Sequence, residues 1–249
     1  MSKAVLFGIN YIHTPSAQLR GCVNDVNNMA KYLTDEEKYD VVKVYTDESN
    51  EYKTRANSII NILYKLAIDS HRLELKKVWI HFSGHGCYIP DHDGDEKDGK
   101  DECIVPSDFR QSGVITDDLI KRVLRYFNKN TKVTCVFDCC HSGTVCDLKY
   151  IYKDNNKEPV EVNTFSKCEA KVCMISGCMD NQTSADAYNV QGKREFSGAM
   201  TSCLLLTLSQ DKKIFNVMYK LRSLLRQKGF TQYPQLASSY VITDTESFC

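Results

Sequence analysis

The sequence predicts an α/β fold in which helices cover both faces of a mostly parallel central β-sheet. Three apolar runs, at 78–82, 133–137 and 172–176, are short and rich in β-branched residues, as buried parallel strands are. Segments with apolar residues at helical spacing lie between runs of this kind. Because strands that alternate with helices favour parallel pairing, the 249 residues are expected to form one such domain.

The remaining elements follow from the same patterns. Further strands are expected at 4–9, 41–45 and 233–237, the last at a sheet edge because Pro234 cannot donate to a neighbouring strand. The expected helices are 23–33, 54–66, 117–127, 197–209 and 215–228. Residues 87–108 read as an acidic excursion, a hairpin that packs back through Ile104 and Val105. Residues 149–167 read as an exposed polar loop.

Composition excludes several classes of protein. The 32 basic and 32 acidic residues give a formal net charge of zero, which argues against a nucleic-acid binder. No apolar run reaches the length of a membrane span, and no signal peptide or leader is expected before the first strand. The twelve cysteines include no C-x-x-C pair, so zinc-finger spacing is absent. Without a secretory signal, we expect reduced thiols in a cytoplasmic monomer that binds no membrane.

Two strands end in residues that could carry out nucleophilic catalysis. Cys140 follows the apolar run 133–137, and His85, flanked by glycines, follows the run 78–82. Open α/β sheets bind their ligands at the carboxyl ends of strands, so the pair suggests a thiol nucleophile and its base. The alternative is a packing cysteine and a structural histidine. Among the competing bases, His81 is expected in the core, His92 in the acidic loop and His141 beside Cys140 in sequence.

The acidic residues allow two simpler interpretations. Asp138 follows an apolar run, and a buried carboxylate needs a partner, for which an internal Lys or Arg would suffice. Residues 91–102 have acids at the spacing of an EF-hand calcium loop, but Glu96 stands where that loop requires Gly, and the segment follows a strand. We therefore interpret the EF-hand spacing as a decoy.

Five stretches, taken in order, resemble the metacaspases, a family of caspase-like cysteine peptidases. They are GINY at 8–11 with GCVNDVNNM at 21–29, HFSGHG at 81–86, DGKDECIVPSD at 98–108, FDCCHSGT at 137–144 and ISGCMDNQTSADA at 175–187. The resemblance covers nearly the whole chain. It implies one caspase-like sandwich over 1–249, with a large portion to about 148, the loop 149–167 and a small portion from about 168.

The resemblance also implies catalytic roles. Cys140 would be the nucleophile of a cysteine endopeptidase and His85 its general base. The backbone N–H groups of Gly86 and Cys140 would form the oxyanion hole. Cys139 stands where the family pattern has Ser, and alternation along the chain turns it away from the face used by Cys140.

Substrate recognition is the next implication. Asp25, Ser83 and Asp138 match family positions that line a pocket for a substrate Arg or Lys at P1, and Asp180 is expected to face the substrate groove. The expected substrates are thus polypeptides with basic P1 residues.

Calcium activation is implied as well, through Asp101, Asp117, Asp118 and Asp147. Hard cations prefer such oxygen ligands from separate segments. The alternative is that Asp117 and Asp118 only add charge to a helix N-terminus.

Self-cleavage after Lys149 or Lys153 is expected from their position in the exposed loop. Two other functions remain open: a catalytically silent caspase-like scaffold, and a thiol hydrolase or redox enzyme that uses Cys139 and Cys140.

Overall fold

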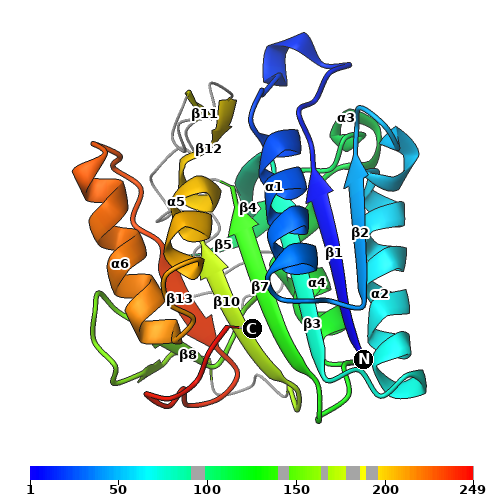
Figure 1. The fold of residues 1–249 in the computed structure, drawn as a ribbon. Helices are drawn as coiled ribbons and strands as arrows, with labels where there is room; N and C mark the ends of the chain where they lie inside the picture. The colour runs from blue at the N-terminus through cyan, green and yellow to red at the C-terminus, as the bar shows by residue number, and fades with distance from the viewer. Residues whose placement is uncertain (91–98, 140–145, 164–167, 178–185, 189–195, 249) are drawn as a thin grey trace.

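An eight-stranded sheet forms the centre of the protein (Figure 1). The structure, a computed structural model, describes residues 1–90, 99–139, 146–163, 168–177, 186–188 and 196–248. In spatial order the sheet contains β2 (Val41–Thr46), β1 (Ser2–Gly8), β3 (Lys77–Ser83), β7 (Lys132–Asp138), β10 (Lys171–Ser176), β13 (Gln235–Ser238), β8 (Tyr150–Tyr152) and β9 (Val160–Glu161). The first five are parallel and the last three pair antiparallel. The predicted mostly parallel α/β sheet is confirmed.

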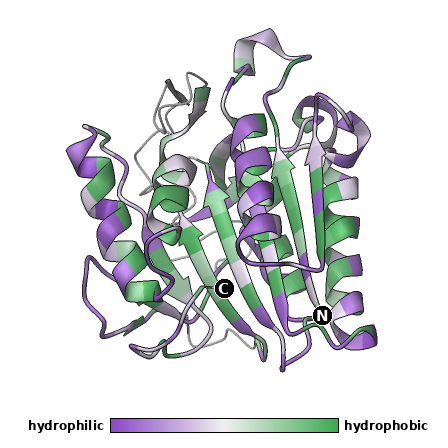
Figure 2. Ribbon diagram, viewed as in Figure 1, coloured by the Kyte–Doolittle hydropathy of each residue, from purple (hydrophilic) through white to green (hydrophobic). Residues whose placement is uncertain are grey.

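Helices cover both faces of this sheet. α1 (Cys22–Asp35), α5 (Ala199–Leu208) and α6 (Ile214–Gln227) lie on the face toward the viewer in Figure 1, and α2 (Ala56–Arg72) and α4 (Asp117–Leu124) lie on the other. The short α3 (Phe109–Ser112) precedes α4. Side chains of a strand alternate between faces, so Val78, Ile80 and Phe82 pack with α2 and α4, whereas Trp79 packs with α1 and α5. The strands are accordingly apolar along much of their length (Figure 2).

The second half of the sheet departs from expectation. β13 pairs with β10 on one side and β8 on the other, so this strand is interior and the predicted edge position is wrong. Pro234 precedes the strand and therefore costs it no ladder hydrogen bond. The segment 149–167 is also not a plain exposed loop, because it contributes β8 and β9, and Tyr152 is buried at 2% exposure. The sequence did indicate a strand here, because Tyr150, Ile151 and Tyr152 are aromatic and β-branched residues, which favour β-strands.

A small sheet follows β3 and carries the acidic segment. β4 (Gly86–Pro90) and β5 (Lys100–Ile104) form the expected hairpin, and β6 (Ile115–Thr116) adds a third strand. Ile104 and Val105 are buried, as predicted. The EF-hand spacing at 91–102 lies mostly outside the described residues. A second small sheet pairs β11 (Asp186–Tyr188) with β12 (Phe196–Gly198).

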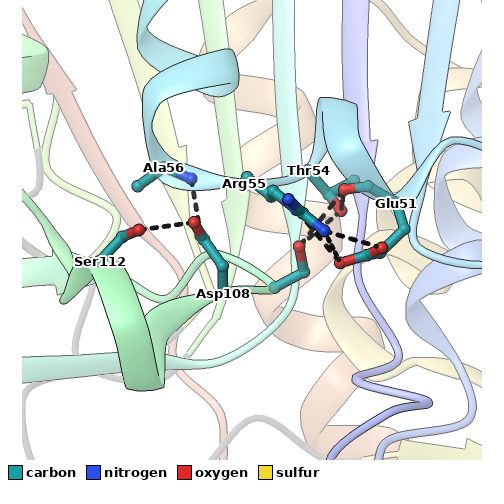
Figure 3. A network of polar contacts seen from close by, with 7 residues as sticks. Glu51, Thr54, Arg55, Ala56, Asp108 and Ser112 are labelled. Carbon is teal, nitrogen blue, oxygen red and sulfur yellow. Dashed lines mark hydrogen bonds and ion pairs between the residues drawn. The ribbon is translucent and has the colours of Figure 1, made fainter.

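The segment after β5 is tied to the start of α2 by polar contacts (Figure 3). The Asp108 carboxylate accepts hydrogen bonds from the Ala56 N–H at 2.8 Å and the Ser112 hydroxyl at 2.7 Å. Nearby, Thr54 donates to Ser107 at 2.9 Å. The carboxylate satisfies one of the unpaired N–H groups at the helix N-terminus. These contacts hold the backbone that leads away from Val105, a residue in contact with the candidate site.

None of the helices in the described parts of the chain has both the length and the apolarity that crossing a lipid bilayer demands.

Candidate active site

The candidate site lies where β3 and β7 end. These neighbouring parallel strands pair Ser83 with Asp138, so they end at the same level of the sheet. His85 lies two residues after Ser83, and Cys140 two residues after Asp138. Cys140 itself lies outside the described residues, as does the competing base His141.

The imidazole of His85 is held by the backbone of the loop after β1. Its Nε2 lies 2.7 Å from the carbonyl oxygen of Ala17. A carbonyl oxygen can only accept, so Nε2 carries the hydrogen, and in the neutral ring Nδ1 is left with the free lone pair. Nδ1 is thus the atom able to take a proton. The Ala17 carbonyl has a role that sequence patterns did not indicate.

Tyr11 supports the same histidine from a second side. Its ring lies 4.7 Å from the imidazole, centroid to centroid, and its hydroxyl accepts from the His85 N–H at 2.8 Å and donates to the Val105 carbonyl at 2.7 Å. Tyr11 has a φ of 54°, a conformation that is strained for a bulky side chain. Tyr11 lies in the GINY stretch, but nothing in the sequence indicated its role.

The other residues of the two motifs are placed as follows. Gly86 begins β4 directly after His85. His81 is fully buried, and burial lowers its pKa to about 3, so it is the expected core histidine. Cys139 is fully buried in the apolar cluster that includes α2 and α4. His92 and Asp180 lie outside the described residues.

Asp25, Ser83 and Asp138 are brought together although 113 positions separate the first from the last. The Ser83 hydroxyl donates to the Asp25 carboxylate at 2.7 Å, and the other Asp25 oxygen accepts from the Gly198 N–H at 2.7 Å. Asp138 accepts from the Thr201 N–H at 2.9 Å, within the first turn of α5. Both carboxylates are 1% exposed. An anion at a helix N-terminus is favoured by the helix dipole.

Gly198 lies between these two carboxylates. A Cβ at Gly198 would lie 2.4 Å from an oxygen of Asp138 and 2.6 Å from an oxygen of Asp25, so the two groups approach the same point. The two acids were predicted site residues, but nothing in the sequence marked Gly198, which stands in an ordinary F-S-G-A stretch. Two buried carboxylates that face one point can bind a cationic group strongly.

A second group of acids lies around the start of α4. Asp101 and Asp117 are buried, Asp147 is 8% exposed and Asp118 is partly exposed. They come from β5, α4 and the segment after β7. Burial raises the pKa of Asp117 to about 7, and the negative charges of Asp101 and Asp147 act in the same direction, against hydrogen bonds from the N–H groups of Glu102 and Asp118.

Every side chain of this group offers carboxylate oxygens, the ligand type that hard cations prefer. Lys121 lies among them: its ammonium is bonded to Asp147 and lies 3.9 Å from Asp118. Within the residues that the structure describes, no three His, Cys, Asp or Glu side chains form a group arranged to hold a metal ion. Lys121 was not singled out in the sequence, where it reads as an ordinary helix lysine.

The fold and the site residues define the class as caspase-like, and comparison with known proteins agrees. A metacaspase peptidase C14 domain model matches residues 2–149. Metacaspase-1B of Aspergillus niger is 33% identical over 291 residues, an alignment that covers 96% of this chain and 65% of the relative. Metacaspase-2 of Trypanosoma brucei brucei is 34% identical over 266 residues, covering 99% and 75%. The chain belongs to the metacaspase family.

A solved structure supports the fold. Protein GSU0716 of Geobacter sulfurreducens superimposes with a TM-score of 0.67 at 23% identity, over 96% of this chain and 93% of that one. Family membership places the chain among the caspase-like cysteine endopeptidases. It spans about two thirds to three quarters of the length of the metacaspases named above.

Proposed function

We propose that this protein is a calcium-activated cysteine endopeptidase that cleaves polypeptides after Arg or Lys. The observation that carries the proposal is the pair of buried carboxylates, Asp25 and Asp138. They lie at the carboxyl ends of β3 and β7, where His85 also lies. A substrate guanidinium or ammonium would pair with both carboxylates, whereas an Asp side chain at P1 would be repelled. Asp180 is proposed to line the groove beside them.

In the proposed reaction, Nδ1 of His85 takes the proton from the thiol of Cys140. The thiolate attacks the carbonyl carbon after the basic residue, and the N–H groups of Gly86 and Cys140 donate to the oxyanion. The imidazolium then gives its proton to the leaving amine, and water hydrolyses the acyl-enzyme. The Ala17 carbonyl stabilises the imidazolium because it accepts from Nε2 throughout.

Calcium is proposed to bind through Asp101, Asp117, Asp118 and Asp147 and to neutralise their mutual repulsion. Its role would be to order the segments that carry them, since β5 and the segment after β7 both adjoin the catalytic loops. The ion takes no part in the chemical step.

The protein is further proposed to work as a monomer in the cytoplasm. The described cysteines support this location, because they are free thiols, the state that a reducing compartment maintains.

The test uses fluorogenic peptides with Arg, Lys or Asp at P1, with calcium or with a chelator. Arg and Lys peptides should be cleaved only with calcium, and Asp peptides not at all. Cys140→Ala should abolish cleavage. Cys139→Ser should keep most of it, because alternation along the chain turns the Cys139 side chain away from the face that Cys140 uses. An active Cys140→Ala enzyme would show that the nucleophile is misassigned. Failure to cleave any peptide would favour the catalytically silent scaffold.

A further inference from the structure

The hydroxyl of Tyr11 lies inside the hydrogen-bond ladder between β4 and β5. These strands pair antiparallel with Gly86 opposite Ile104, and the same register sets His85 opposite Val105 at the open end of the hairpin. In a regular antiparallel pair of this kind, two opposite residues exchange both N–H···O bonds. Here the Val105 N–H donates to the His85 carbonyl at 3.0 Å. The return bond runs through the tyrosine, whose hydroxyl accepts from the His85 N–H at 2.8 Å and donates to the Val105 carbonyl at 2.7 Å.

The inserted hydroxyl therefore sets the spacing between the backbone at His85 and the backbone at Val105. A direct bond would draw the two backbones together and move the Cα atom that carries the imidazole. The Tyr11 ring also contacts the imidazole, with the ring centroids 4.7 Å apart. Burial raises the pKa of the Tyr11 hydroxyl well above its ordinary value, so this group keeps the proton that it donates. Gly84 leaves room for the hydroxyl, because a Cβ there would lie 2.9 Å from it.

Asp47 in turn holds the loop that carries Tyr11. The loop follows β1, and Asp47 follows β2, the parallel neighbour of β1. One oxygen of the buried carboxylate accepts from the Asn10 N–H at 2.9 Å, and the other accepts from the Ile12 N–H at 3.1 Å. The carboxylate thus binds the backbone on both sides of Tyr11. Hydrogen bonds to a charged acceptor are strong enough to compensate the strain of a tyrosine with a φ of 54°.

We propose that Tyr11 and Asp47 are positioning residues for the peptidase reaction. Asp47 fixes the loop after β1, and the Tyr11 hydroxyl sets where the imidazole of His85 lies. The inference rests on the proposed role of His85 as general base and adds the groups that hold it. A base works only within hydrogen-bond reach of the proton that it moves, and a misplacement of about 1 Å costs about 100-fold in rate.

The test compares Tyr11→Phe with Tyr152→Phe in the presence of calcium. Tyr152 is the matched control, because it is a buried tyrosine whose hydroxyl also accepts a backbone N–H, that of Ile242, at 2.7 Å. Its strand, β8, is separated from β7 by β10 and β13. Two substrates with Arg at P1 are used. One is a peptide, whose leaving amine needs a proton from His85, and the other is a nitrophenyl ester, whose leaving group needs none. Urea denaturation checks that each variant is folded.

Tyr11→Phe should lower kcat/KM for the peptide by about 10- to 100-fold, because the base is misplaced. The ester should lose less, so the ratio of peptide to ester kcat/KM should fall by at least about fivefold. Partial unfolding would lower both values equally and leave the ratio unchanged. Tyr152→Phe should lose stability and keep both values. Asp47→Asn, which replaces one of the two acceptor oxygens with a donor, should lower the ratio as Tyr11→Phe does.

A wild-type ratio in folded Tyr11→Phe would overturn the inference for the tyrosine, and a wild-type ratio in Asp47→Asn would overturn it for the carboxylate. If Tyr11→Phe does not fold, Asp47→Asn carries the test, because it leaves the hydroxyl in the chain. His85→Ala separates this failure from failure of the proposed function. Inactive His85→Ala beside a wild-type ratio in Tyr11→Phe would leave His85 as the base and refute only its positioning by Tyr11. If His85→Ala cleaves peptides as the wild type does, both proposals are wrong.

Discussion

Gly198→Ala is the sharpest test of the two buried carboxylates. The added Cβ would lie 2.4 Å from Asp138 and 2.6 Å from Asp25, well inside van der Waals contact. Neither carboxylate can move without loss, because Asp25 accepts from Ser83 and from Gly198 itself, and Asp138 accepts from Thr201. Overpacking of this kind costs about 1–3 kcal/mol of stability.

The effect on catalysis should be separable from the effect on stability. The methyl group takes the position between the carboxylates and displaces at least one of them, so a charge-assisted contact to the P1 side chain is lost. Such contacts are worth about 1.5–3 kcal/mol, which corresponds to a fall of about 10- to 150-fold in kcat/KM for Arg peptides. The assay is kcat/KM under conditions where urea denaturation shows the variant to be folded.

The control is Gly229→Ala. Gly229 has a φ of 80° and open space where a Cβ would lie, so alanine introduces backbone strain of about 1 kcal/mol far from the acids in sequence. It should lower stability and leave kcat/KM unchanged. If Gly198→Ala cleaves Arg peptides with wild-type kcat/KM, the two carboxylates do not form the specificity site.

Three further predictions concern other parts of the chain. Asp138→Ala should lose cleavage after Arg and Lys while circular dichroism shows a folded protein; retained kcat/KM would contradict its role. Burial holds the pKa of His81 at about 3 against 6.5 in the unfolded chain, so the folded state binds fewer protons. The contribution of His81 to the free energy of unfolding should therefore be fully present above pH 6.5 and be lost as the pH falls toward 3. In urea titrations, His81→Asn should show a smaller loss of stability over this range. Self-cleavage should occur after Lys153, which is exposed, rather than after Lys149, which is half-buried and forms an ion pair with Glu161 of β9 at 3.5 Å; intact mass after calcium addition tests this, and Lys153→Gln should stay whole.

The strands that lead into the catalytic motifs could be predicted from the sequence, because their residue patterns are local and clear. The runs 78–82 and 133–137 are β-branched and end in small or polar residues, and they became β3 and β7 within a residue at either end. Their parallel orientation followed from the alternation of strands and helices. The position of β13 could not be read in this way, because strand order depends on which edges remain free after the parallel core has formed.

For the candidate site, sequence determined which chemical groups are present and at which strand ends, and through family resemblance it named Asp25, Ser83 and Asp138. Tertiary structure alone decided what those groups face. Gly198 lies between two acids, the Ala17 carbonyl holds one nitrogen of His85, and Lys121 pairs with Asp147 and Asp118. The physical reason is that hydrogen bonds and ion pairs act over a few ångströms in space, between residues whose separation along the chain carries no signal of their contact.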